Sequence, residues 1–434
     1  MHGNGKLALF VDRLLGASPL LPSNAGSYGN ARPLPESPVQ SLRFQMGVLA
    51  TLQALLLTNN VTLIAISSLA GYALAQDKAY ATLPVTGYVL GAACFSMLAA
   101  QLMRKRGRRF GYSIGAMLAG CGALLAAWAV SIGSLWLLAA ATFVTGIYNA
   151  FGASYRFAAA DVADAYRPAF RARAISLVLA GGIVGGVVGP ELSKVTREML
   201  PATYAGSYLV LAGFAILSLI LAQCLRLPPS TGAIAHGPAR PLLQILRQPV
   251  CWVAVLTAAS AYGIMNLLMV ATPLAMAFCT HPYAATALVL EWHVIGMFLP
   301  GLFTGALITR FGVLPVIVTG CVLMLVCIAV ALNGVTIAHF VVALALLGVG
   351  WNFAYTGATT LLTYAYRPAE KMRIQGFNDM VVFVTMITSS ASSGILLNSN
   401  GWAVLNYLSL PFVLAVMLAV TWLASRRALI GVAS

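Results

Sequence analysis

The sequence has little charge for its length. Asp, Glu, Lys and Arg make up 8% of its 434 residues and only ten residues are acidic, whereas 60% are hydrophobic. Soluble domains carry about 25% charged residues, so this composition excludes an ordinary soluble globular protein. It is typical of a chain that lies in a lipid bilayer.

Several chemical signatures are also missing. The seven cysteines form no Cys-x2-Cys pair and have no histidine nearby at metal-ligand spacing, so we expect packing roles and no metal or disulfide. No nucleotide-binding loop occurs, which excludes ATP as the direct driver, and we expect no cofactor. No His-x4-Asp, Gly-x-Ser-x-Gly or His-Glu-x2-His string occurs, which disfavours a membrane enzyme acting on lipids.

Long apolar runs dominate what is present. Each is long enough to cross about 30 Å of hydrocarbon as a helix, and none has the alternation of barrel strands. The sequence therefore predicts an all-α integral membrane protein with twelve transmembrane helices, at residues 44–72, 80–103, 110–132, 134–163, 172–193, 205–226, 250–278, 284–309, 313–333, 336–364, 374–398 and 402–425.

An internal repeat divides these helices into two halves. The string Ala-Tyr-Arg-Pro-Ala occurs at 165–169 and again at 365–369, each time between two apolar runs. Such duplication is typical of secondary transporters. We expect two six-helix bundles, at residues 44–226 and 250–425, joined by a cytoplasmic linker at 227–249. Residues 1–43 are expected to form a disordered cytoplasmic arm that is no signal peptide, and residues 426–434 a cytoplasmic tail.

Basic residues are distributed unevenly between the two sides. If both termini face the cytoplasm, 21 of the 25 Lys and Arg residues fall on that side, and Lys78, Lys194 and Arg197 fall on the other. This asymmetry predicts a multi-pass protein of the cytoplasmic membrane with both termini inside. The net charge of +15 then indicates topology and contact with anionic lipids, not nucleic acid. We expect a monomer.

One loop carries a family motif. The stretch Ala100–Arg109 resembles the loop 2–3 signature of the major facilitator superfamily. The matching residues are Leu102, Lys105, Gly107, Arg108 and Arg109, whereas Ala100 stands in place of the usual Gly and Arg104 in place of the usual acid. A weaker copy, with Arg310 and Gly312, ends the stretch 305–312 of the second half. The resemblance implies two pseudo-symmetric halves that rock about a central site.

The resemblance also implies a cytoplasmic gate. The stretch from Asp164 to Arg171 is similar to the acid-x6-Arg end of helix 4 in that family, and a solvated ion pair is the alternative reading. Together with the two loop motifs, the expected gate comprises Gly107, Arg108, Arg109, Asp164, Arg171, Arg310 and Gly312. Gly185-x3-Gly189-Pro190 resembles half of the family's antiporter motif, but glycines four residues apart also suit close helix packing.

Ionisable residues inside a membrane are costly and therefore suggest function. Glu291, His293, Asp379 and Asp161 are the proton-coupling candidates. Asp161 could instead form a salt link with Arg156, and a buried His is also a common interhelical hydrogen-bonding group. Since Glu291 and His293 lie two residues apart on a helix, they need separate partners.

In the family the central cavity is lined by helices 1, 4, 7 and 10. The polar and aromatic residues at mid-depth of those helices here are Asn59, Asn60, Tyr148, Asn149, Tyr155, Arg156, Tyr262, Asn266, Trp351, Asn352 and Tyr355. This mostly neutral, aromatic set suits a planar or amphipathic organic solute. The alternative is that Asn and Tyr side chains hold helices together.

Further segments, such as 292–298 and 348–353, resemble a group of bacterial permeases that are mostly without assigned substrates and include some riboflavin carriers. We therefore expect a secondary active transporter of a small organic molecule, coupled to protons or to sodium. Drug or metabolite export and vitamin import both remain open. A lipid enzyme and a transport-fold sensor are the alternatives from other classes.

Overall fold

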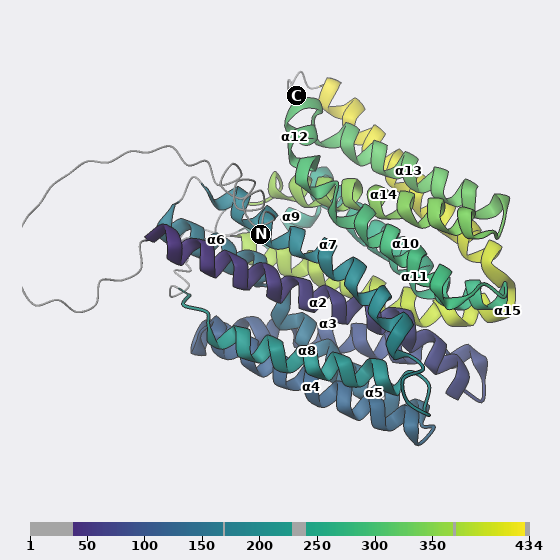
Figure 1. Ribbon diagram of the computed structural model, residues 1–434. Coiled ribbons are helices and arrows are strands. Elements are labelled where there is room, and N and C mark those ends of the chain that lie inside the picture. Colours follow the sequence, from purple (N-terminus) through teal and green to yellow (C-terminus); the bar gives the residue numbers. More distant parts are fainter. Residues whose placement is uncertain (1–37, 168–169, 228–239, 368–369, 430–434) are drawn as a thin grey trace, which may run out of the picture. The chain divides into compact units, whose positions relative to one another are not determined.

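The computed structural model describes residues 38–167, 170–227, 240–367 and 370–429. Within them every element is helical (Figure 1). The first half contains α2 Pro38–Leu74, η1 Lys78–Tyr80, α3 Leu83–Arg106, α4 Arg108–Ser131, α5 Leu135–Gly152, α6 Tyr155–Tyr166, α7 Arg171–Thr196 and α8 Ala205–Gln223. The second half contains α9 Leu242–Leu246, α10 Pro249–Phe278, α11 Tyr283–Phe298, α12 Gly301–Phe311, α13 Val313–Asn333, α14 Ile337–Thr363 and α15 Lys371–Leu429.

Most of the predicted arm, residues 1–37, lies outside the described residues. Helix α2 begins at Pro38, six residues before the predicted start of the first apolar run. Proline is favourable in the first turn of a helix because its missing N–H would have no partner there. The last residues of the predicted arm thus belong to a helix that a proline begins.

The helices make twelve membrane spans in the described part of the chain. Nine spans are single, counting Leu135–Tyr166 as one, and α11 with α12 forms a tenth that bends by 41° at Leu299 and Pro300. The remaining stretch, Arg373–Arg426, is 54 residues long and would measure about 80 Å as one helix. It is broken at Gly401, where φ is +78°, and so supplies the last two spans.

The two loop motifs adopt the same turn. Gly107 separates α3 from α4 with φ +85° and ψ 155°, and Gly312 separates α12 from α13 with φ +88° and ψ 162°. An L side chain rarely adopts such a positive φ, so glycine is needed at both positions. Each turn is a single residue long, and the same backbone geometry recurs in both halves.

Close helix contacts are also duplicated. In the first half, Gly91 of α3 and Gly146 of α5 each face a backbone carbonyl of the other helix, and a Cβ at Gly91 would lie 2.0 Å from the oxygen of Phe143. In the second half, Gly348 of α14 lies against α11, where its Cβ would lie 2.3 Å from the oxygen of His293. Only glycine allows backbones to approach so closely.

The outward surface of the helices is strongly apolar. Large side chains from both halves are among the most exposed, including Met97, Trp136, Val195 and Leu418, which are 68%, 69%, 75% and 70% exposed. A surface of this kind is stable in lipid and not in water.

The end of the linker is fixed to the second half. The Arg240 guanidinium donates to both carboxylate oxygens of Glu370, at 2.8 and 2.7 Å, and to the carbonyl oxygen of Ala365. Glu370 also accepts from the backbone N–H groups of Arg240 and Arg367. These donors, the Arg240 guanidinium foremost, hold the pKa of the Glu370 carboxyl well below its usual range.

Candidate functional site

Three aromatic rings meet at mid-depth in the second half. Trp351 and Tyr355 of α14 stack with their ring centroids 5.3 Å apart and 10° between their planes. Tyr262 of α10 meets both edge-on, at 5.1 Å and 4.7 Å. Tyr262 and Tyr355 remain partly exposed. The cluster thus offers ring surface on which a planar molecule could stack.

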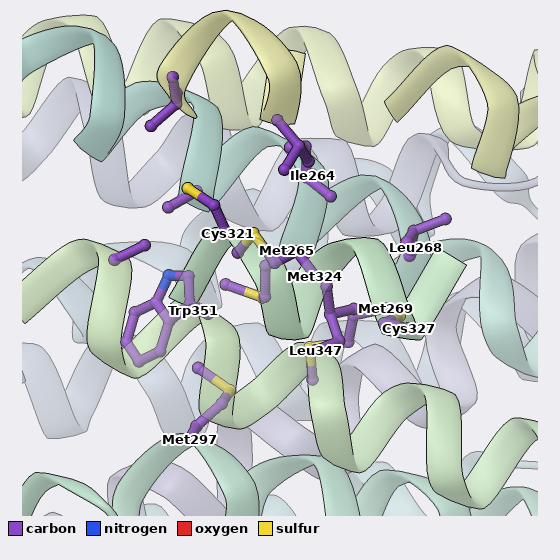
Figure 2. Close-up of a cluster of buried hydrophobic side chains, with 14 of the residues drawn as sticks. Ile264, Met265, Leu268, Met269, Met297, Cys321, Met324, Cys327, Leu347 and Trp351 are labelled. Atoms are coloured by element: carbon purple, nitrogen blue, oxygen red, sulfur yellow. The ribbon is translucent and has the colours of Figure 1, made fainter. Parts of the chain in front are cut away.

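Trp351 connects this cluster to the core. Its indole Nε1 is buried and has no hydrogen-bond partner. Figure 2 shows Trp351 at the edge of a group of sulfur-containing side chains, which includes Met265, Met297 and Cys321. Methionine side chains are flexible and polarizable, so they adapt to neighbouring shapes.

The first half contributes amides at a similar depth. The Asn60 side chain donates to Asn149 Oδ1 at 3.2 Å and accepts from the Tyr88 hydroxyl, and Asn59 donates to Asn60 at 3.5 Å. These contacts join three spans, α2, α3 and α5. Asn60 and Asn149 are partly exposed, whereas Asn59 is buried.

Opposite charges from the two halves act on the aromatic cluster. The Arg156 guanidinium of α6 and the Asp379 carboxylate of α15 both interact electrostatically with the hydroxyls of Tyr262 and Tyr355, and with each other. Arg156 stacks over the ring of Phe157 at 4.8 Å, while its Nε is buried and has no hydrogen-bond partner. A charged donor and a charged acceptor, one from each half, are therefore within electrostatic range of the two tyrosine hydroxyls.

Two predicted cavity amides of the second half bind helices together. Asn266 donates to the carbonyl oxygen of Met386 and to the hydroxyl of Ser389. Asn352 donates to the carbonyl oxygen of Met297 and accepts from Thr304, on either side of the bend between α11 and α12. The helix-packing alternative accounts for both side chains.

Two predicted cavity tyrosines of the first half are also packing residues. The Tyr148 hydroxyl donates to Ser218 of α8 at 3.2 Å. Tyr155 is fully buried against Tyr112, with 4.7 Å between the ring centroids. Neither ring offers surface to a solute.

Among the described residues, Asp161 does not form the salt link with Arg156 that the sequence left open. Asp161 Oδ2 instead accepts from Arg108 Nη2 at 2.6 Å, and Arg108 Nη1 donates to Ser154 O, which lies at the break between α5 and α6. Residues five apart lie on different sides of a helix. Asp161 is therefore held by the loop 2–3 motif.

The other predicted gate residues have varied surroundings. Arg109 donates to Gln223 of α8, so both arginines of the motif bind within the first half. Arg310 lies over the ring of Phe311. Asp164 is exposed near the end of α6, and the side chain of Arg171 lies outside the described residues.

Glu291 and His293 have separate partners, as their spacing predicts. His293 is fully buried, and its Nδ1 lies 2.8 Å from Leu344 O. Since a carbonyl only accepts, Nδ1 carries the hydrogen in this contact. Glu291 faces Lys194 of α7, with 3.7 Å between Oε1 and Nζ.

Sequence reasoning missed the contacts that join the halves. The hydrogen bonds among them lie at the end of the helices that contains η1, hereafter the Lys78 end. Thr82 and Thr86 hydrogen-bond to Ser390, and the hydroxyls of Ser193 and Tyr283 lie 2.6 Å apart. The signal available in the sequence is small: Glu191 and Lys194 stand three residues apart near the end of one apolar run.

The family model for the Major Facilitator Superfamily matches residues 48–290. The chain is also 39% identical over 374 residues to the riboflavin transporter RfnT of Brucella anthropi, covering 85% of this chain and 93% of that protein. The chain belongs to the major facilitator superfamily. It is therefore a multi-pass transporter of a small molecule and not an enzyme.

More distant relatives agree with this membership. The chain is 27% identical to YdeG of Bacillus subtilis, an uncharacterized MFS-type transporter, over 84% of this chain and 88% of that protein. A variant of the nucleoside transporter NupG superimposes with a TM-score of 0.70 at 14% identity, covering 88% of this chain and 99% of that one. The xylose transporter XylE of E. coli, in a partially occluded inward-open conformation, gives 0.66 at 13% identity, covering 87% and 97%. These neighbours show the fold alone.

Proposed function

We propose that this transporter carries a planar heteroaromatic solute of the riboflavin type by alternating access. The observation that carries the proposal is the stacked Trp351–Tyr355 pair with Tyr262, within electrostatic range of Arg156 and Asp379 from opposite halves. Flavin rings present a stacking face together with hydrogen-bond donors and acceptors at one edge, which such a site can satisfy. The 39% identical riboflavin transporter supports this substrate class.

In this proposal the site opens alternately to the two sides of the membrane. We propose that residues 44–226 and 250–425 rock against each other, with the Gly107 and Gly312 turns on the cytoplasmic side and the Lys78 end outside. This places both termini in the cytoplasm of a bacterium, next to anionic lipids, and follows from the distribution of basic residues. The functional unit is a monomer, driven by protons through one or more of Glu291, His293, Asp379 and Asp161.

The antiporter-like glycines have a sufficient packing explanation. A Cβ at Gly185 would lie 2.3 Å from Ala54 O, and one at Gly189 would lie 3.0 Å from Thr58 O, both on α2. These glycines are therefore required by the contact of α7 with α2. They give no support to export over import.

Purified protein in liposomes tests the function directly. We expect riboflavin flux, followed by flavin fluorescence, that accelerates with a proton gradient and not with a sodium gradient. The orientation of the gradient that drives uptake gives the direction of transport. Absence of both flavin binding and flavin flux in folded protein would contradict the substrate class, and acceleration by sodium alone would contradict proton coupling.

A further inference from the structure

A cluster of three charges lies where α7 meets α11 at the Lys78 end. Lys194 forms ion pairs with Glu191 of its own helix and, at 3.7 Å, with Glu291 of the other half. Glu291 is only 8% exposed, and its Oε1 has no hydrogen-bond partner. Two acids thus share one base at a contact between the halves.

The charges of this cluster do not balance. With all three groups ionised the cluster carries a net charge of −1, and a net charge is strongly disfavoured where one of its carboxylates is buried. Both carboxyls face the same base: Glu191 Oε1 pairs with Lys194 on α7, and Glu291 Oε1 lies 3.7 Å from Lys194 Nζ. Protonation of either carboxyl brings the net charge of the cluster to zero.

Other titratable groups on the helices that pack against α11 have partners elsewhere. On α14, His339 bonds to Thr336. On α10, Tyr262 belongs to the aromatic cluster, and on α12, Arg310 lies over Phe311. None of these groups is a partner of Glu291 among the described residues.

The remaining neighbours lie on α11 itself and just beyond α7. His293 bonds to Leu344 O on the other side of its helix. Arg197 follows α7, lies over the ring of Tyr283 and pairs with Glu198. Among the described residues, Glu191 and Lys194 are thus the charged groups that act on Glu291.

We propose that Glu191, Lys194 and Glu291 form a one-proton site that controls separation of the halves at the Lys78 end. The proton makes the cluster neutral and stabilises the closed contact. Its loss leaves one uncompensated carboxylate, which is solvated when α7 and α11 part. The proposal deepens the proton coupling of the proposed function and rests on it, because it assigns the coupling proton to this carboxyl pair.

Amide hydrogen exchange of the full chain in lipid nanodiscs, without substrate, tests the site. After correction for the pH dependence of chemical exchange, we expect the opening of amides near Thr82 and Tyr283 to become more frequent as pH rises. One proton limits the slope to about tenfold per pH unit. Glu291→Gln and Glu191→Gln each make the cluster neutral without a proton, so both should remain closed and lose the slope.

Glu198→Gln is the matched control, because Glu198 lies near the same end but pairs with Arg197 instead of Lys194. It should keep the slope of the natural chain. A flat profile in the natural chain, or an unchanged slope in both glutamine variants, would overturn the proton site. A sloped profile without flavin transport would overturn the substrate class and leave this site standing.

Discussion

At mid-depth the first half presents amides and a guanidinium, whereas the second half presents three aromatic rings. The 200-residue repeat makes Tyr155 equivalent to Tyr355 and Arg156 equivalent to Thr356. Tyr155 is fully buried against another tyrosine, while Tyr355 is partly exposed and stacks on Trp351. The turns and the close glycine contacts, by contrast, recur in both halves. Duplication has thus kept the backbone contacts, and the side chains of the candidate site have diverged.

The largest effect on stability should come from substitution in the close glycine contacts that both halves contain. Gly91→Val and Gly348→Val should each destabilise the protein by about 3 kcal/mol or more, because the new side chain must displace a backbone carbonyl. Unfolding of detergent-solubilised protein measures both. Gly213→Ala, which meets nothing within 4 Å, is the control. A large loss in one half only would break the equivalence of the two contacts.

Arg156 should distinguish substrates by charge. Arg156→Gln should weaken binding of a phosphorylated flavin by about tenfold or more, as expected for loss of a charged hydrogen bond, and weaken neutral riboflavin less. Equilibrium titration of flavin fluorescence measures both. Arg310→Gln, which alters an arginine outside the aromatic cluster, should change neither affinity. Equal losses for both ligands would assign Arg156 a structural role.

Substitution of the two equivalent tyrosines, Tyr155 and Tyr355, should distinguish a role in stacking on the solute from a role in helix packing. Tyr355→Leu should lower flavin affinity by about two- to tenfold through loss of an aromatic contact. Tyr155→Leu should lower the unfolding temperature and leave affinity nearly unchanged, since its ring is fully buried in the first half. If Tyr155→Leu also lowered affinity in folded protein, the division between the halves would not hold.

The smallest effect should come from substitution of Glu370, which directly follows the second copy of the repeated string at 365–369. Its equivalent in the first half is the buried Phe170. Because the Glu370 pKa is lowered in the folded state, its contribution to stability is complete above the unfolded value of about 4.3 and is lost as pH falls through the folded value.

Thermal unfolding at several pH values measures that contribution. Glu370→Gln should be less stable than the natural chain at pH 7, and the difference should shrink as pH falls below about 4.3. Phe170→Leu should give a difference that does not depend on pH. A constant difference for Glu370→Gln would show that the Arg240 contact is not electrostatic.

Long apolar runs are sufficient to predict the spans, because a helix that satisfies its own backbone in lipid needs little from its neighbours. The breaks are less visible. The run 284–309 is bent at Pro300, and the run 134–163 is interrupted at Ala153 and Ser154. At that interruption Arg108, from another helix, donates a further hydrogen bond to Ser154 O, which also accepts from the backbone N–H of Ala158. A bend of this kind depends on contacts from other helices.

The sequence predicts the candidate site as a set of residues but not as a set of contacts. The depth of Tyr262, Trp351 and Tyr355 places all three in the predicted cavity, yet nothing in their spacing reveals that the rings meet. The salt link with Arg156 that the sequence left open for Asp161 is replaced by one with Arg108, which approaches from another helix. The pairing of Lys194 with Glu291 is invisible in the sequence because about 100 residues separate them.

The sequence by itself determined that this chain spans a membrane and that its halves are duplicated, and it predicted related loop motifs that contain Gly107 and Gly312. These properties depend on hydrophobicity and backbone conformation, which are local. Only the tertiary structure decided which charges pair and which rings stack. A charge or ring in a bilayer takes its partner from whichever helix lies against it, and that contact is set by the packing of the whole bundle.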